Sequence, residues 1–353
     1  RSFPADTIVA KAQAAQINQE EKRVDYKLPG INFGVIEPLG AVKDITFAEY
    51  HKYVFELNKG LFIFDGSLVL VNKSNLSNGF AYTYANQTYQ ISRALTYSNS
   101  NYCMDLEIKI TNLSSAQIAV DLPIVLGQFD LEQKSGSAPR FQDMMISENG
   151  KVSHPNIKKP AVFNDIKFIG MRDQYFCAII QPESTGYSAF VDKVSDKVYN
   201  TGILAKGLVL APGSTLVQQF KVYLGPQESD IINKTNSNWS AIVHFGAFDL
   251  VAQVILGLLK FLFIVVKNWG MAIVLLSIAI YLILFPLTVA QMKSMKEMQL
   301  LQPKMEKLRT TYASDARKLN EETMKLYKEH KVNPLAGCLP MLLQIPVFIS
   351  LYQ

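Results

Sequence analysis

An uncharged stretch of 25 residues, from Asn268 to Met292, constrains the fold of this chain more than any other feature. Within it, Gly270–Val289 supplies 20 residues, which at about 1.5 Å per residue can cross the ~30 Å hydrocarbon core of a bilayer. Trp269 at its start is typical of the aromatic belt at a membrane surface. The sequence therefore predicts a transmembrane helix over residues 268–290.

Charges are unevenly distributed along the 353 residues. They make up 18% of the chain, against roughly 25% in average globular domains. The shortage is confined to the stretch above and to Val332–Gln353, which is also uncharged. This distribution indicates a water-exposed domain joined to membrane segments. It excludes a purely cytosolic enzyme, a disordered tail and a small disulfide scaffold.

Residues 23–235 show the alternation of β-strands. In Tyr102–Ile110, for example, apolar residues alternate with Cys103, Asp105, Glu107 and Lys109, as in a strand with one buried face. Turn signals such as Asn78-Gly79 recur through the region. We expect a large antiparallel β-sandwich. Its aromatic residues either line a sugar groove or belong to the core, and they include Phe62, Phe64, Tyr82, Tyr84 and Tyr89.

The two ends of the chain suggest that more sequence lies beyond them. Residues 1–22 are rich in Ala, Gln and Glu and predict a linker or stalk. The chain begins at Arg1 without methionine and stops at Gln353 within an apolar helical pattern. We expect a membrane anchor or signal sequence upstream. Residues 334–353 are expected to begin a further transmembrane helix.

Residues 240–267 form an apolar stretch with one narrow polar line. The line contains Asp249, Gln253, Gly257, Lys260 and Lys267. This pattern favours an amphipathic helix lying in the membrane interface. The alternative is a spanning helix, in which Lys260 near the bilayer centre would cost roughly 2.5–3.5 kcal/mol.

Residues 291–333 are basic, with ten cationic and six anionic side chains. A basic loop beside a transmembrane helix marks the cytoplasmic side, which places the β domain in the periplasm. Apolar residues spaced by three and four predict a hairpin of two helices, with Pro303 bending the first helix or starting it anew. Ser314 or Asp315 is the expected N-cap of the second helix. Candidate contacts for a substrate or ribosome are Lys304, Lys307, Arg309, Arg317 and Lys318.

Polar side chains follow one face of the predicted transmembrane helix. Ser277, Tyr281, Thr288 and Gln291 lie along it, and Gln344 on the returning segment is a candidate to meet them. They either line a water-accessible groove within the membrane or merely hold helices together.

No pattern in the sequence indicates catalysis. The three cysteines have no metal or redox spacing, and the four histidines are scattered. Phosphate-binding loops, nucleophile elbows and metalloprotease motifs are absent from the sequence. We expect no cofactor, no metal and no enzymatic activity. Cys103 and Cys177 are either buried free thiols or a disulfide between neighbouring strands.

The C-terminal part resembles the YidC, Oxa and Alb family of membrane protein insertases. The resemblance is dense over about residues 267–353. It rests on the motifs Asn268-Trp269-Gly270, Pro286-Leu287-Thr288, Leu301-Gln302-Pro303-Lys304, Val332 to Pro340 and Gln344 to Phe348. Weaker matches are Arg172 to Phe176 and Val222 to Pro226. The order of the segments is similar to the Gram-negative form, which implies a large antiparallel β-supersandwich as the periplasmic domain, followed by an interfacial helix and the insertase core.

The resemblance implies a bacterial inner-membrane insertase and chaperone. Family members shelter the polar part of a nascent membrane protein in a groove, alone or beside the Sec translocon and its accessory subunits. The cytoplasmic hairpin is where they meet substrates, the ribosome or a targeting receptor, and membrane lipids surround the helices. An arginine usual in the groove is replaced here by Tyr281, which forms hydrogen bonds but carries no fixed positive charge.

Two other functions remain open from the sequence. One is a membrane-anchored periplasmic carbohydrate-binding protein, in which the helices serve only as an anchor. The other is a membrane-bound glycan enzyme, for which the sequence offers no carboxylate or histidine motif.

Overall fold

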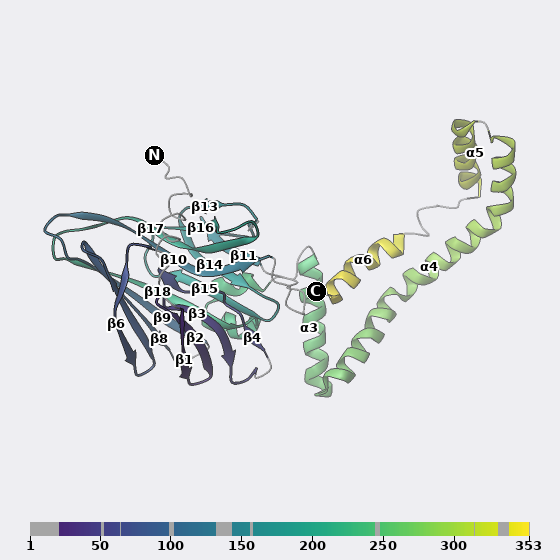
Figure 1. Ribbon diagram of the computed structural model, residues 1–353. Helices are drawn as coiled ribbons and strands as arrows, with labels where there is room; N and C mark the ends of the chain where they lie inside the picture. The colour runs from purple at the N-terminus through teal and green to yellow at the C-terminus, as the bar shows by residue number, and fades with distance from the viewer. Residues whose placement is uncertain are drawn as a thin grey trace. The chain divides into compact units, whose positions relative to one another are not determined.

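The computed structural model describes residues 21–50, 53–63, 65–98, 102–131, 143–155, 158–243, 248–313, 315–330 and 339–352 (Figure 1). The chain divides into two compact units, Arg1–Val243 and His244–Gln353. Residues 1–20 of the expected linker lie outside the described residues, as do Ser314 and the segment 331–338 with Cys338. The last residue of the expected linker, Lys22, already belongs to the first strand.

The first unit is built from three antiparallel sheets. A four-stranded sheet contains, in order, β1 (Lys22–Leu28), β2 (Ile31–Glu37), β3 (Ala41–Phe47) and β4 (Val54–Phe55). A five-stranded sheet contains β13 (Ala161–Phe163), β16 (Tyr187–Lys193), β17 (Val198–Leu210), β10 (Ile118–Asp130) and β5 (Phe62–Ile63).

The third sheet has nine strands, and two short helical segments follow it in the chain. Its order is β12 (Lys151–Ser153), β11 (Asp143–Glu148), β14 (Ile166–Arg172), β15 (Phe176–Pro182), β18 (Thr215–Pro226), β9 (Cys103–Asn112), β8 (Tyr89–Tyr97), β7 (Gly79–Ala85) and β6 (Val69–Leu76). The helical segments are α2 (Ser229–Thr235) and η2 (Ser237–Ile242). The predicted class, an antiparallel β-sandwich followed by helices, is confirmed.

The core forms where the apolar faces of the strands meet. In β9 the alternate residues Met104, Leu106, Ile108 and Ile110 are all buried, as the period of two predicts. They belong to one large cluster that draws on all three sheets. Most of the candidate groove aromatics belong to the core as well, since Phe62, Tyr82 and Tyr84 are buried and Tyr89 is half-buried. Phe64 lies outside the described residues.

Cys103 and Cys177 are free thiols on opposite sides of one strand. Cys103 lies opposite Tyr223 of β18, and Cys177 lies opposite Gly225 of the same strand. Two strand spacings amount to about 9.5 Å, whereas bridged cysteines need Cα atoms within roughly 7 Å. The alternative of a Cys103–Cys177 disulfide is therefore excluded by the register of the sheet.

We expect both thiols to be alkylated after unfolding without any reductant. Burial raises the pKa of the Cys103 thiol to about 11 and the pKa of Cys177 further still, so neither is a reactive thiolate near neutral pH. Alkylation of the folded protein at pH 8 should leave Cys177 unmodified. Peptide mass spectrometry reads both results, and a Cys103–Cys177 linked peptide would contradict them.

The second unit is helical. It contains α3 (Asp249–Val266), α4 (Trp269–Thr311), α5 (Ala316–Glu329) and α6 (Leu339–Tyr352). The predicted boundary between the transmembrane helix and the basic hairpin, at residue 290, lies inside one continuous helix. This helix, α4, runs through both Pro286 and Pro303 (Figure 1). A proline inside a helix frees the carbonyl four residues earlier. Those residues are Leu282 and Gln299, and at the exposed Gln299, in the polar half of α4, the freed carbonyl can turn outward to water without breaking the helix.

Candidate functional site: the α4 stripe and the basic hairpin

A tight turn between α3 and α4 sets the start of the long helix. Lys267 ends α3 in the left-handed conformation, with φ of 51°. Asn268 is the N-cap of α4, and its side chain accepts a hydrogen bond of 3.1 Å from the amide of Met271. Trp269 stacks on Phe263 with ring centroids 3.9 Å apart. The sequence motif Asn268-Trp269-Gly270 is thus a helix cap and a ring contact that join two helices.

The first half of α4 has the properties of a membrane span. Among the described residues, α4 is the one helix long and apolar enough to cross a bilayer. Its large apolar side chains are mostly exposed, as for Leu282 and Ile283 at 63% and 69%. Such exposure in water would be costly, so the surface fits a lipid environment. The shorter apolar helix Leu250–Val266 in α3 is consistent with either an interfacial or a spanning position.

The polar stripe of α4 exists, but its hydroxyl groups are partly satisfied within the helix. Ser277 donates to the carbonyl of Ile273 at 2.9 Å, and Thr288 donates to the carbonyl of Leu284 at 3.1 Å. Both oxygens keep free lone pairs as acceptors. Tyr281 is 61% exposed, and its ring lies 6.0 Å from that of Phe285.

The two glutamine side chains complete the set of stripe candidates. Gln291 on α4 and Gln344 on α6 are both half-buried. Among the described residues, no hydrogen bond joins Gln344 to the α4 stripe. The stripe therefore consists of the four α4 residues Ser277, Tyr281, Thr288 and Gln291.

The second half of α4 and α5 form a basic helical hairpin. Leu301 is buried and Met305, Leu308, Leu319 and Leu326 are half-buried, in agreement with the predicted packing seam. Asp315 is the N-cap of α5 and accepts from the amide of Lys318 at 3.0 Å. Most of the cationic side chains point to solvent, and those of the candidate contact set are Lys304, Lys307, Arg309, Arg317 and Lys318.

Two contacts organise cations of the hairpin. Lys318 lies over the ring of Tyr312, 5.6 Å from its centroid. Lys304 Nζ lies 2.8 Å from His330 Nε2, and His330 Nδ1 lies 3.0 Å from the carbonyl of Leu326. Because a carbonyl only accepts, Nδ1 carries the hydrogen and Nε2 accepts from the lysine. No sequence pattern pointed to His330, since it lies 26 residues from its partner.

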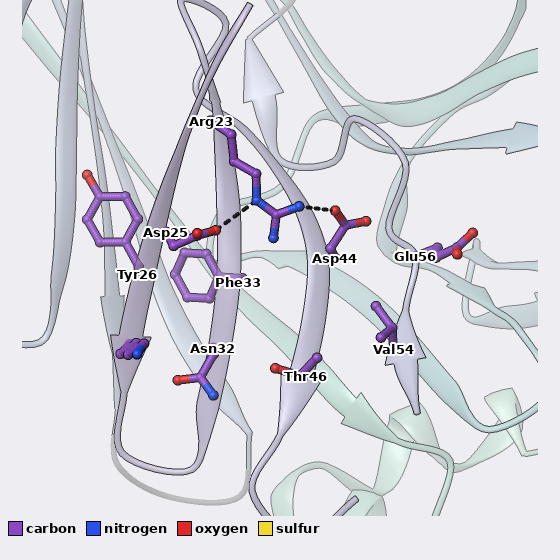
Figure 2. Close-up of a pocket in the computed structure, with 10 residues that line it drawn as sticks. Arg23, Asp25, Tyr26, Asn32, Phe33, Asp44, Thr46, Val54 and Glu56 are labelled. Atoms are coloured by element: carbon purple, nitrogen blue, oxygen red, sulfur yellow. Dashed lines mark hydrogen bonds and ion pairs between the residues drawn. The ribbon is translucent and has the colours of Figure 1, made fainter. Parts of the chain in front are cut away.

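A separate pocket of about 540 Å³ lies on the four-stranded sheet (Figure 2). Arg23 crosses it, donating from Nε to Asp25 at 2.7 Å and from Nη1 to Asp44 at 2.5 Å. Of its two aromatic residues, Phe33 is buried, and the ring of the half-buried Tyr26 packs against Phe33 and Phe80. A sugar site needs an exposed ring face, so this pocket does not favour the carbohydrate-binding alternative.

The fold and these features define a membrane protein with a large β unit, a hydroxyl-bearing span and a basic hairpin. The family model described as the YidC periplasmic domain matches residues 62–258, and the one described as the 60Kd inner membrane protein matches residues 261–353. The chain belongs to the YidC family of membrane protein insertases.

Individual relatives agree with this assignment. The membrane protein insertase YidC of Geotalea daltonii is 32% identical over 302 residues, which cover 82% of this chain and 55% of that protein. That of Syntrophus aciditrophicus is 34% identical over 271 residues, covering 75% and 50% respectively. This chain spans about half the length of these relatives. Both are named as insertases, not as enzymes.

The solved structures that match part of this chain are distant. A galactose mutarotase-like protein from Lactobacillus casei matches 57% of this chain and 100% of its own, with a TM-score of 0.41 and 8% identity. At these values the likeness says nothing about function.

Proposed function

We propose that this protein integrates newly made proteins into the bacterial inner membrane, acting alone or beside the Sec translocon. The β unit lies in the periplasm and the hairpin in the cytoplasm, with the first half of α4 between them. The observation that carries the proposal is the α4 stripe, Ser277, Tyr281, Thr288 and Gln291, on a helix with the length of a membrane span. Membership of an insertase family supports it.

The proposed mechanism is physical and makes or breaks no bond. A polar segment crossing hydrocarbon loses its hydrogen bonds to water, and each unsatisfied group costs several kcal/mol. The free lone pairs on Ser277 and Thr288, the Tyr281 hydroxyl and the amides of Gln291 and Gln344 would replace part of that hydration. Burial of the substrate's own apolar helix in lipid supplies the driving force.

The hairpin is the proposed receiving surface for substrates. Its exposed cations Lys304, Lys307, Arg309, Arg317 and Lys318 suit an RNA, an anionic lipid or an acidic protein. The ribosome or a targeting receptor is therefore the expected partner on this side. Nascent membrane proteins are the expected cargo.

Removing the stripe hydroxyls should slow insertion. We expect the triple variant Ser277→Ala, Tyr281→Phe, Thr288→Val to insert a short single-span substrate on the order of a hundredfold more slowly, because each of the three hydrogen bonds contributes on the order of 1 kcal/mol. The measurement uses purified protein in liposomes and scores protease-protected substrate. Removal of the hairpin should abolish insertion, whereas Ile283→Val on the lipid-exposed face should not change it.

The same assay tests the missing groove charge. Tyr281→Arg should favour substrates with acidic translocated segments over neutral ones, because a fixed cation attracts carboxylates in a medium of low dielectric constant.

Parent protein that performs no better than empty liposomes, while a co-supplied Sec translocon inserts the substrate, would rule out autonomous insertion.

A further inference from the structure

The segment after the last strand packs back onto the β unit. Ile232 of α2 and Trp239 and Ile242 of η2 are buried, each at 1% exposure or less. They form a second apolar cluster with residues of the nine-stranded sheet, including Phe168 and Ile179. This cluster is separate from the main core. The α2–η2 segment therefore belongs physically to the β unit, although it follows the last strand.

Polar contacts fasten the start and middle of this segment. Asn236 Nδ2 and Trp239 Nε1 both donate to Oε1 of Gln181, at 3.0 and 2.8 Å. The Tyr50 hydroxyl donates to Glu228, the N-cap of α2. These contacts leave the final turn of η2 to be held by other groups. Its last carbonyls have no partner within the helix.

Arg172, the last residue of β14, reaches that final turn. Its Nη1 donates to the carbonyl of Ile242 at 3.1 Å and to Oε1 of Gln227 at 3.2 Å. Its Nη2 lies 3.5 Å from Asp143 Oδ2, on the residue directly opposite in β11. Asp143 also contacts His154 Nδ1 at 3.1 Å. The guanidinium thus joins two strands, the end of β18 and the end of η2.

Burying the Arg172 guanidinium costs free energy, and its hydrogen bond to the final turn of η2 offsets part of that cost. The Arg172 side chain is only 10% exposed, and its Nε has no hydrogen-bond partner among the described residues. A buried charge persists only where its partners are well placed. Burial alone would raise the pKa of Asp143, but His154, Arg172 and the amide of Met144 lower it overall. The carboxylate therefore stays ionised beside the arginine at neutral pH.

We propose that Arg172 is a positioning residue that fastens the final turn of the β unit, residues 240–243, to β14. The chain then leaves the unit at a fixed point, and the connection to α3, called the tether here, begins after Ile242. Seven residues from Ile242 to Asp249 reach at most about 25 Å, whereas the ten residues from Trp239, which keeps its own contact with Gln181, would reach about 35 Å. Arg172 thereby keeps the tether to the membrane helices short.

Hydrogen exchange of the whole chain in detergent micelles tests this role. In Arg172→Met, which keeps the side-chain volume but removes every donor, amides of residues 237–243 should exchange about tenfold faster, as expected for loss of one charge-assisted hydrogen bond. Peptides of β15 and β18 should keep their protection. The Val243 amide, which donates to Ser240 at 3.0 Å, is the most direct reporter.

Two further variants make the result specific. Arg172→Lys keeps the charge but loses the two-pronged geometry, so its exchange should lie between parent and Arg172→Met. If Arg172→Met does not fold, the hydrogen exchange is measured on Arg172→Lys instead. Lys193→Met removes an exposed ion pair with Asp196 and should change nothing. Unchanged exchange at 237–243 in both Arg172 variants, or equal loosening of β15 and β18, overturns the proposal.

Discussion

Replacing Arg93 by alanine is expected to destabilise the β unit by about 3–5 kcal/mol. Arg93 is 1% exposed and donates from Nη2 to the carbonyl of Gly40 at 2.5 Å and from Nη1 to that of Leu61. Its guanidinium lies 5.7 Å from the ring centroid of Phe80. Alanine would leave a cavity and two buried carbonyls without partners. Urea unfolding, followed by the fluorescence of buried Trp239, measures the loss.

Arg93→Met separates packing from charge. Burial lowers the pKa of Arg93, and no carboxylate hydrogen-bonds to it among the described residues, so the cation itself is costly. Methionine fills much of the same space without that cost and should lose less than half as much stability as alanine. Lys109→Ala, which removes an exposed pair with Glu107, should cost under about 1 kcal/mol. Equal unfolding midpoints for Arg93→Ala and the parent would refute the expectation.

Gly202→Ala should prevent the β unit from folding or destabilise it by more than about 3 kcal/mol. A Cβ at position 202 would lie 2.0 Å from the carbonyl oxygen of Ile124. Gly202 lies in β17, which pairs with β10 on one side and β16 on the other. Neither backbone can withdraw without breaking its hydrogen bonds. Circular dichroism and urea unfolding measure the outcome.

The control for Gly202 lies on the same strand. Val209 of β17 is 59% exposed, so Val209→Ala changes a side chain without a close backbone neighbour. It should shift stability by no more than about 1 kcal/mol. A Gly202→Ala protein as stable as Val209→Ala would contradict the close approach of the Ile124 carbonyl to position 202.

The strands could be predicted from the sequence because burial imposes a period of two. The same pattern contained an overlooked signal, since Ile91, Arg93 and Leu95 alternate on one buried face of β8. Because arginine is usually exposed, the alternation alone did not indicate that Arg93 lies in the core. The division into sheets was beyond prediction, because pairs such as β10 with β5 and β18 with β9 join residues far apart in the chain. Their order depends on packing between faces.

The helical site was predictable in its composition but less so in its contacts. The stripe and the hairpin seam follow from helical spacing, which fixes the face on which each residue lies. Pro303 suggested a bend or a new helix start because the interior of a helix seldom tolerates proline. The helix nevertheless continues through Pro286 and Pro303, and at Pro303 the freed carbonyl of the exposed Gln299 can accept a hydrogen bond from water. The contacts of Arg172 and His330 depend on tertiary structure, which no local spacing encodes.

Because α4 is continuous, a change in the tilt of its first half also moves its second half. Beyond the uncharged stretch, residues 293–311 extend the same helix by about 28 Å, at 1.5 Å per residue. A change of about 10° in the tilt of the membrane-spanning half would move the far end of that extension by about 5 Å relative to its base. Movement of the first half of α4 is thereby transmitted to the hairpin, and a force on the hairpin exerts torque on the first half.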